Sequence, residues 1–313
     1  MQTVSIITYH FVRKFHNTKY PEIKGLPVKD FSEQLNYLSK HYVFVTAEDC
    51  INAIYNNSDL PSNPVLLTFD DGYIDHFTEV FPILKKLGIK GAFFPSSKAV
   101  QENKVLSVNK IHFILASVKN SKVLINDIYE SLDSNRHLYN LNSNKYYFEL
   151  LTRNLYGFDN KEITFIKRIL QKELDKKLRE SIIDKLFKKY VTYDEDSFAN
   201  ELYMNISQIE HMIGHGMHIG GHGHEHCWLN TLSPKEQEVD IDASLVFLKK
   251  IGIDSNNWIM CYPYGGYNKS LIEILKKKNC KLAFTVNKSI AKMNKKNALT
   301  LERFDTNDLP LTC

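Results

Sequence analysis

Hydrophobic positions along this chain follow two alternating periods. Short apolar runs rich in β-branched residues are typical of buried strands, and apolar residues spaced three and four apart are typical of one-sided helices. The first pattern predicts strands over residues 4–8, 42–45, 65–69, 90–94, 217–219, 258–261 and 281–286. The second predicts helices over residues 28–41, 47–55, 74–87, 206–213, 234–250 and 269–278. Strands that alternate with helices indicate an α/β fold with a parallel sheet, here closed into a barrel.

The middle of the chain has a different amino-acid composition. Residues 101–205 contain no proline and one of the 13 glycines, and they are rich in Lys, Glu, Leu, Ile, Tyr and Asn. Within this stretch, residues 162–190 place apolar side chains at helical spacing with charges between them, which predicts one or two amphipathic helices. We therefore expect a discontinuous barrel of residues 1–100 and 206–313, interrupted by a helical insertion or cap over 101–205. No motif decides the role of the insertion.

Composition narrows the class of protein only slightly. The chain has 313 residues, 43% of them hydrophobic and 24% charged, as in an ordinary globular protein. Its formal net charge of +4 gives no case for nucleic-acid binding. Residues 1–10 resemble a first strand and not a signal peptide, and no apolar run reaches the length of about 18 residues that a membrane span needs. The five cysteines are scattered and odd in number, so we expect free thiols and a cytoplasmic protein.

Two adjacent carboxylates end the strand predicted over residues 65–69. Asp70 and Asp71 are followed by Gly72, and a solvated Asp-Asp-Gly turn is the plainest interpretation. However, ligands bind at the carboxyl ends of parallel strands. Two neighbouring carboxylates there need a cation or a shared proton to offset their repulsion. The pair is therefore a candidate for chemistry.

A histidine cluster follows another predicted strand. His222 and His226 are four residues apart after a Gly-Gly turn, and together with one carboxylate they would form a triad that leaves positions open on a metal ion. His224, at an offset of two, is expected to face away from the ion. Cys227 is an alternative ligand because thiolates bind Zn²⁺ well. Histidines in isolation are usually core or surface residues, so the clustering carries this hypothesis.

These motifs resemble those of the polysaccharide deacetylase family, which is carbohydrate esterase family 4 with its NodB-homology domain. Residues 68–72 (TFDDG) are similar to the first family motif, and residues 221–226 are similar to the second, a His-x-x-x-His metal motif in which Gly223 replaces the usual Ser or Thr. Residues 262–265 (YPYG) are similar to the third motif. The resemblance covers roughly residues 1–100 and 206–305 and implies a distorted (β/α) barrel.

The resemblance also implies roles for individual residues. Asp71, His222 and His226 would bind a divalent metal, commonly Zn²⁺. Asp70 would be the general base that takes a proton from the attacking water, and the backbone N–H of Tyr264 would help to stabilise the oxyanion. The two adjacent carboxylates would then have different roles: Asp71 would bind the cation, and Asp70 would remain free to accept a proton.

Two departures from the family pattern leave roles unassigned. The arginine that usually orients the base is replaced by Cys261, and the stretch over 299–305 lacks the histidine that usually serves as general acid. His10 and His112 are candidates for the acid. Arg303 and Asp305 either line the site and bind substrate anions or form a structural ion pair with each other. Tyr73 and the tyrosines of the 262–267 loop are candidates to stack on sugar rings.

The leading hypothesis is a metal-dependent hydrolase that removes an N-acyl group, acetyl first of all, from an amino sugar. Without a signal peptide, we expect the substrate to be an intracellular precursor of a surface glycan: a nucleotide-linked, lipid-linked or monosaccharide unit. One alternative is a deformylase of a lipid-linked amino sugar. Another is a non-catalytic carbohydrate-binding or regulatory protein that has kept the metal site. An aspartate-nucleophile phosphotransferase fits poorly, since such sites need the second aspartate two residues on. The oligomeric state is left open.

Overall fold

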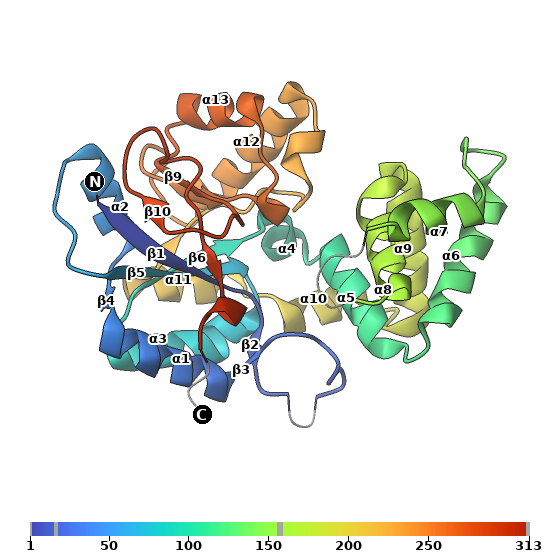
Figure 1. Ribbon diagram of the computed structural model, residues 1–313, viewed down its shortest axis with the longest axis horizontal. Helices are drawn as coiled ribbons and strands as arrows, with labels where there is room; N and C mark the ends of the chain where they lie inside the picture. The colour runs from blue at the N-terminus through green and yellow to red at the C-terminus, as the bar shows by residue number, and fades with distance from the viewer. Residues whose placement is uncertain (1, 16–17, 155–158, 311–313) are drawn as a thin grey trace. The chain divides into compact units, whose positions relative to one another are not determined.

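The chain divides into two compact units. The computed structural model (Figure 1) describes residues 2–15, 18–154 and 159–310. Unit 1 comprises Met1–Lys14, Lys24–Lys104 and Ala199–Cys313, and unit 2 comprises Phe15–Ile23 and Val105–Phe198. Residues 15–23, which the sequence pattern gave no reason to separate from the barrel, thus group with the helical unit. The candidate chemistry of the strand ends lies in unit 1.

Parallel strands form the centre of unit 1. Strand β5 (Pro64–Asp71) lies between β1 (Thr3–Tyr9) and β6 (Gly91–Pro95), and β6 pairs with β7 (His218–Ile219). The short strands at its margins are β4 (Val43–Phe44), which pairs with β5, and β10 (Ala291–Lys292) and β11 (Phe304–Asp305), which pair with β1. The antiparallel strand is β10, and the others run parallel.

A second ladder closes the sheet into a ring. Strand β8 (Ile259–Cys261) pairs with β9 (Leu282–Phe284). Single bridges join Gly221 to Met260 and Phe284 to Leu301, and the chain after Leu301 continues into β11 beside β1. The predicted distorted barrel is therefore confirmed. At these two places a single bridge replaces a longer ladder.

Side chains on the strands alternate between two cores, as the period of two in a strand requires. One core fills the barrel and includes Ile6, Leu66, Phe94, Ile259, Phe284 and Leu301. The other lies between the strands and the helices and includes Ile7, Leu67, Phe69 and Phe93 with side chains of the surrounding helices. On β5 the inward series that begins at Leu66 continues through Thr68 to Asp70. A carboxylate thus takes a core position at the strand's carboxyl end.

Most helices of unit 1 begin and end where the pattern predicts. They are α1 (Val28–His41), α2 (Ala47–Tyr55), α3 (Phe81–Leu87), α11 (Ile206–Gly214), α12 (Pro234–Lys250) and α13 (Lys269–Lys277). Helix α4 (Ser97–Glu102) was not predicted. The helix predicted over 74–87 carries a π-helical turn over His76–Val80, which periodicity alone does not signal. Two short paired strands, β2 (Val12–Arg13) and β3 (Leu26–Pro27), were also not predicted.

Unit 2 is helical, as the composition of the insertion predicts. Its helices are α5 (Ser107–Ser117), α6 (Ser121–Asn135), α7 (Asn144–Thr152), α8 (Lys161–Arg168) with a π-helical turn (Ile169–Glu173), α9 (Lys176–Tyr190) and α10 (Glu195–Leu202), which ends in unit 1. Helix α9 packs against α5 and α6. The buried ammonium of Lys110 pairs with Asp184 at 2.6 Å and Glu195 at 3.0 Å. Across the described part of the chain, no helix has the length and apolar character to cross a membrane.

Candidate active site

The two carboxylates at the end of β5 point in different directions. Asp70 continues the inward face of the strand, whereas Asp71 adopts a left-handed backbone conformation with φ of 74°. Gly72 follows with φ of 75°, and a Cβ at this residue would lie 2.6 Å from the Cβ of Pro95. Glycine is therefore required at this turn. The side chain of Asp71 thus has different partners from that of Asp70.

Asp71 meets two histidines in a buried cluster. Its Oδ1 lies 3.1 Å from Nε2 of His226 and 3.3 Å from Nε2 of His222. Both histidines follow β7, on the segment that bridges to β8. All three residues are buried. Burial by itself raises the pKa of Asp71, but the two histidines outweigh this effect, and the pKa lies well below its ordinary value. The carboxylate is therefore held ionised against the two rings.

The geometry of this cluster fits a divalent metal. Nitrogen and oxygen ligands at about 2.1 Å from Zn²⁺ that subtend tetrahedral or octahedral angles lie about 3.0–3.4 Å from one another. The two measured separations fall in this range. The donor set of two imidazoles and one carboxylate is also one that leaves coordination positions open. Asp71, His222 and His226 could therefore hold such an ion.

Neighbouring groups orient the donors. The hydroxyl of Tyr73 donates to Oδ2 of Asp71 at 2.6 Å. The carbonyl of Cys261 lies 2.9 Å from Nδ1 of His222, and since a carbonyl only accepts, Nδ1 carries a proton and Nε2 is the nitrogen that could coordinate a metal. Tyr73 is 1% exposed and its ring stacks on Phe11. The expectation that Tyr73 stacks on a sugar is therefore wrong, because the ring is buried in protein.

The second carboxylate, Asp70, is held by a buried arginine. Nη1 of Arg303 donates to Oδ1 at 2.9 Å and Nη2 to Oδ2 at 2.7 Å, while the hydroxyl of Thr8 and the thiol of Cys261 each lie 3.3 Å from Oδ2. Nη1 also contacts the hydroxyl of Thr68 at 3.1 Å. Burial raises the pKa of Asp70, but nearby positive groups, first the Arg303 guanidinium, lower it by more than burial raises it. The net pKa is below its ordinary value, so the carboxyl is ionised throughout the neutral range.

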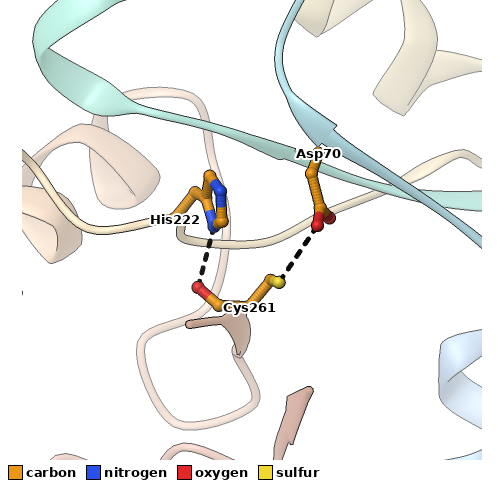
Figure 2. A group of neighbouring side chains, drawn as sticks. All are labelled: Asp70, His222 and Cys261. Atoms are coloured by element: carbon orange, nitrogen blue, oxygen red, sulfur yellow. Dashed lines mark hydrogen bonds between the residues drawn. The ribbon is translucent and has the colours of Figure 1, made fainter. Parts of the chain in front are cut away.

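Asp70, His222 and Cys261 form a second group of potential metal ligands (Figure 2). Figure 2 shows Asp70 and His222 converging on Cys261, which hydrogen-bonds to both. The guanidinium of Arg303 already supplies a positive charge to this group, because its Nη2 lies 2.9 Å from the sulfur of Cys261 and 2.7 Å from Oδ2 of Asp70. We therefore assign this group to the orientation of Asp70 and not to metal binding.

His10 reaches the same site from the end of β1. Its Nε2 lies 3.9 Å from Oδ2 of Asp70, and its side chain is 48% exposed. The backbone carbonyl of His10 accepts a hydrogen bond of 2.8 Å from Nε2 of the buried His76. His10 thus combines contact with the site and contact with solvent.

The YPYG loop lies beside the cluster of Asp71, His222 and His226. Tyr264 has φ of 56° within the short helical turn Pro263–Gly265, directly after β8. Its ring lies 5.0 Å from that of His226 and stacks on Trp228 at 4.8 Å, measured between ring centroids. The loop backbone is therefore fixed next to the cluster.

The remaining expected residues lie elsewhere. The Nδ1 of His224 lies 3.0 Å from the hydroxyl of Ser97 and its Nε2 3.3 Å from Glu102, so this ring faces away from Asp71 as expected. Cys227 belongs to none of the ligand groups found among the described residues. His112 lies on α5 in unit 2. Asp305 caps the turn Thr306–Asp308 by accepting from the backbone of Asn307, while Arg303 pairs with Asp70.

Comparisons with known proteins point to one family. The sequence model described as polysaccharide deacetylase matches residues 57–137 and 190–283, more than half of the chain. YxkH of Bacillus subtilis (strain 168), which carries the name of a polysaccharide deacetylase, is 27% identical over 96 residues. That alignment takes in 30% of this chain and 32% of YxkH, so the match spans about a third of the curated relative.

Solved structures share the fold. The deacetylase PplD of Streptococcus pyogenes, solved with acetate, has a TM-score of 0.59 at 18% identity, covering 97% of this chain and 92% of PplD. IcaB from Ammonifex degensii has a TM-score of 0.56 at 18% identity, with 96% and 90% covered. A de-N-acetylase from Aggregatibacter actinomycetemcomitans has a TM-score of 0.58 at 15% identity, with 97% and 96% covered. From the match of the family model and the motifs at its strand ends, we conclude that this chain belongs to the polysaccharide deacetylase family.

Proposed function

We propose that this protein is a metal-dependent carbohydrate N-deacetylase that releases acetate from an N-acetylated amino sugar. The observation that carries the proposal is the buried cluster of Asp71, His222 and His226 beside a separate, ionised Asp70. A binding module has no need of an unligated carboxylate next to a metal site. The membership of the chain in a deacetylase family supports the same reaction.

Asp71, His222 and His226 would hold the metal, with Zn²⁺ the first candidate for this donor set. When bound, the metal supplies a Lewis acid that polarises the amide carbonyl and lowers the pKa of water. Tyr73 and the carbonyl of Cys261 orient two of the ligands. The chain's own residues then have three tasks: to take a proton from water, to stabilise the developing oxyanion, and to protonate the departing amine.

Asp70 takes the proton in this proposal. Its Oδ2 receives three donors, but Oδ1 receives only Nη1 of Arg303 among the described residues, and a carboxylate oxygen can accept two hydrogen bonds. Oδ1 therefore retains the capacity to accept a proton. The pair with Arg303 keeps the carboxylate ionised and fixes its plane, which prepares it as a general base.

His10 is our choice for the general acid, and the backbone N–H of Tyr264 for the oxyanion donor. As water adds to the carbonyl carbon, Asp70 receives its proton. As the C–N bond breaks, the electron pair goes to nitrogen, which takes a proton from the imidazolium of His10. The products are acetate and a free amino sugar. His10 is preferred because its Nε2 lies 3.9 Å from Asp70 and its side chain is accessible.

A panel assay tests the function. Metal-stripped and Zn²⁺-reconstituted proteins are incubated with N-acetylglucosamine, a nucleotide-linked N-acetyl amino sugar, a lipid-linked one, an N-acetylglucosamine oligomer and N-formyl counterparts, and released acetate and formate are measured. Metal-dependent acetate release is the expected result. Preferential release of formate would identify a deformylase instead. Bound metal without release of either acid from any substrate would favour the non-catalytic, carbohydrate-binding alternative.

A further inference from the structure

The segment that carries both proposed histidine ligands has no regular structure of its own. Residues 222–228 belong to neither a helix nor a strand. Gly223 and His226 adopt left-handed conformations with φ of 68° and 48°. Sites on loops are held less precisely than sites on helices or strands unless surrounding groups support them, so the elements around this loop matter for its shape.

A single carboxylate on α12 holds this loop from one side. Oδ1 of Asp240 accepts the backbone N–H of His224 at 2.8 Å, and Oδ2 accepts the backbone N–H of Glu225 at 2.9 Å. These two residues lie between the proposed ligands His222 and His226. Asp240 is 5% exposed, so its hydrogen bonds face little competition from water.

The helix that carries Asp240 is well anchored. Helix α12 extends over 17 residues and begins at a reciprocal capping box between Ser233 and Glu236. Its Ile241 and Phe247 are buried in the core between helices and strands. A rigid element therefore positions the carboxylate.

The first turn of α4 holds the loop from the other side. The hydroxyl of Ser96 donates to the carbonyl of His224 at 2.8 Å. The backbone N–H groups of Ser97 and Lys98 lie 3.4 Å from the carbonyls of Gly223 and His224. The N–H groups of the loop thus point to α12 and its carbonyls to α4. The ring of His224 also contacts α4, through Ser97 and Glu102.

Gly223 makes room for the carboxylate. A Cβ at this position would lie 2.9 Å from Oδ1 of Asp240, and the φ of 68° disfavours any side chain. This is the position at which the family motif usually has Ser or Thr. In this chain the close approach of Asp240 to the loop therefore depends on a glycine at residue 223.

We propose that Asp240 is a positioning residue that sets the metal affinity of the site by fixing the loop over residues 222–226. This inference rests on the proposed metal site, and it assigns a role to a residue that touches neither metal nor substrate. Groups that orient metal ligands typically contribute 10- to 100-fold in metal affinity. Loss of the Asp240 contact is expected to have an effect of about this size.

The test measures Zn²⁺ affinity by competition with a chromophoric chelator for full-length wild-type, Asp240→Asn and Gly223→Ala proteins. Asparagine keeps the shape of Asp240 but replaces one acceptor oxygen with an NH₂ group, which would face a backbone N–H. Asp242→Asn is the matched control, since Asp242 lies on the same helix and pairs with Lys278 at the surface. We expect Asp240→Asn and Gly223→Ala to weaken binding about 10- to 100-fold, and Asp242→Asn to leave it unchanged.

A folded Asp240→Asn protein with wild-type affinity would overturn the inference. If that variant does not fold, Gly223→Ala decides in the same way. A merely structural role would lower the unfolding temperature of the metal-free protein without changing the affinity of the folded one, so both are measured. A wild-type protein that binds no Zn²⁺ would refute the proposed metal site itself, which is a different outcome from equal binding by wild type and variant.

Discussion

The guanidinium of Arg303 forms a bidentate ion pair with the carboxylate of Asp70, with Nη1 2.9 Å from Oδ1 and Nη2 2.7 Å from Oδ2. The two residues are 233 positions apart in the sequence, and both are buried. The family motif leads one to seek an orienting arginine at residue 261, which is cysteine here. The thiol of Cys261 instead contacts both partners of the pair. The guanidinium therefore reaches the carboxylate from the short segment between the bridge at Leu301 and β11.

Replacing Arg303 tests the consequence of this pair for acid–base chemistry. In Arg303→Gln the cation that lowers the pKa of Asp70 is absent, so burial raises that pKa. A base acts only above its pKa, and the acidic limb of the kcat/KM profile should therefore move to higher pH. Arg303→Lys should restore most of the limb but not the rate, because lysine cannot form the bidentate pair. An unchanged acidic limb in folded Arg303→Gln would contradict the assignment.

Removing the base should separate catalysis from metal binding. We expect Asp70→Asn to lower kcat on the order of a hundredfold or more, as for a positioned general base, and to keep wild-type Zn²⁺ affinity. Elemental analysis and acetate release on the same preparation measure both. Near-normal turnover by the metal-loaded variant would rule out Asp70 as the base.

The general acid can be tested through the leaving group. An amine must be protonated to depart, whereas 4-nitrophenolate needs no proton at neutral pH. His10→Gln should therefore lose about a hundredfold or more on an N-acetyl amino sugar and little on 4-nitrophenyl acetate. Equal losses on both substrates would show that His10 acts on binding or structure and not on the departing amine.

His76 makes a prediction about stability. Burial lowers the pKa of His76 to about 4, while its pKa in the unfolded chain is about 6.5. As the pH falls below 6.5, the unfolded state takes up a proton that the folded state does not, so stability decreases. Replacing this residue in His76→Gln should reduce the loss in unfolding free energy between pH 7 and pH 5 by about 2 kcal/mol. Urea unfolding at both values measures it, and identical pH dependence in wild type and variant would count against a neutral His76.

Periodicity predicted most of the barrel because its strands are buried on both faces and its helices on one. It missed β10 and β11, whose two-residue ladders are too short to leave a pattern. It also missed the π-helical turn over His76–Val80, which changes the hydrogen-bond register without changing composition. These elements depend on tertiary contacts that a local window cannot contain.

In the candidate site, too, the residues found from the sequence are those with a local signal, and the residues missed depend on tertiary contacts. Asp70, Asp71, His222 and His226 were found because each pair is close in sequence and follows a predicted strand. The pairing of Arg303 with Asp70 was left open, since nothing local distinguishes an ion pair with Asp305 from one with a distant strand. One signal was available: Arg303 lies two residues after the buried Leu301, so both face the barrel interior. Asp240 left no such signal, because its partners are backbone N–H groups.

The metal site is tested most directly by the metal content of wild-type and His226→Ala proteins purified without added metal and again after incubation with Zn²⁺. We expect about one tightly bound ion per wild-type chain, and we expect the variant to lose both that ion and the release of acetate. Asp242→Asn serves as a surface control that keeps both. Wild-type protein without metal after incubation, or full occupancy in His226→Ala, would contradict the assignment of Asp71, His222 and His226 as the metal site.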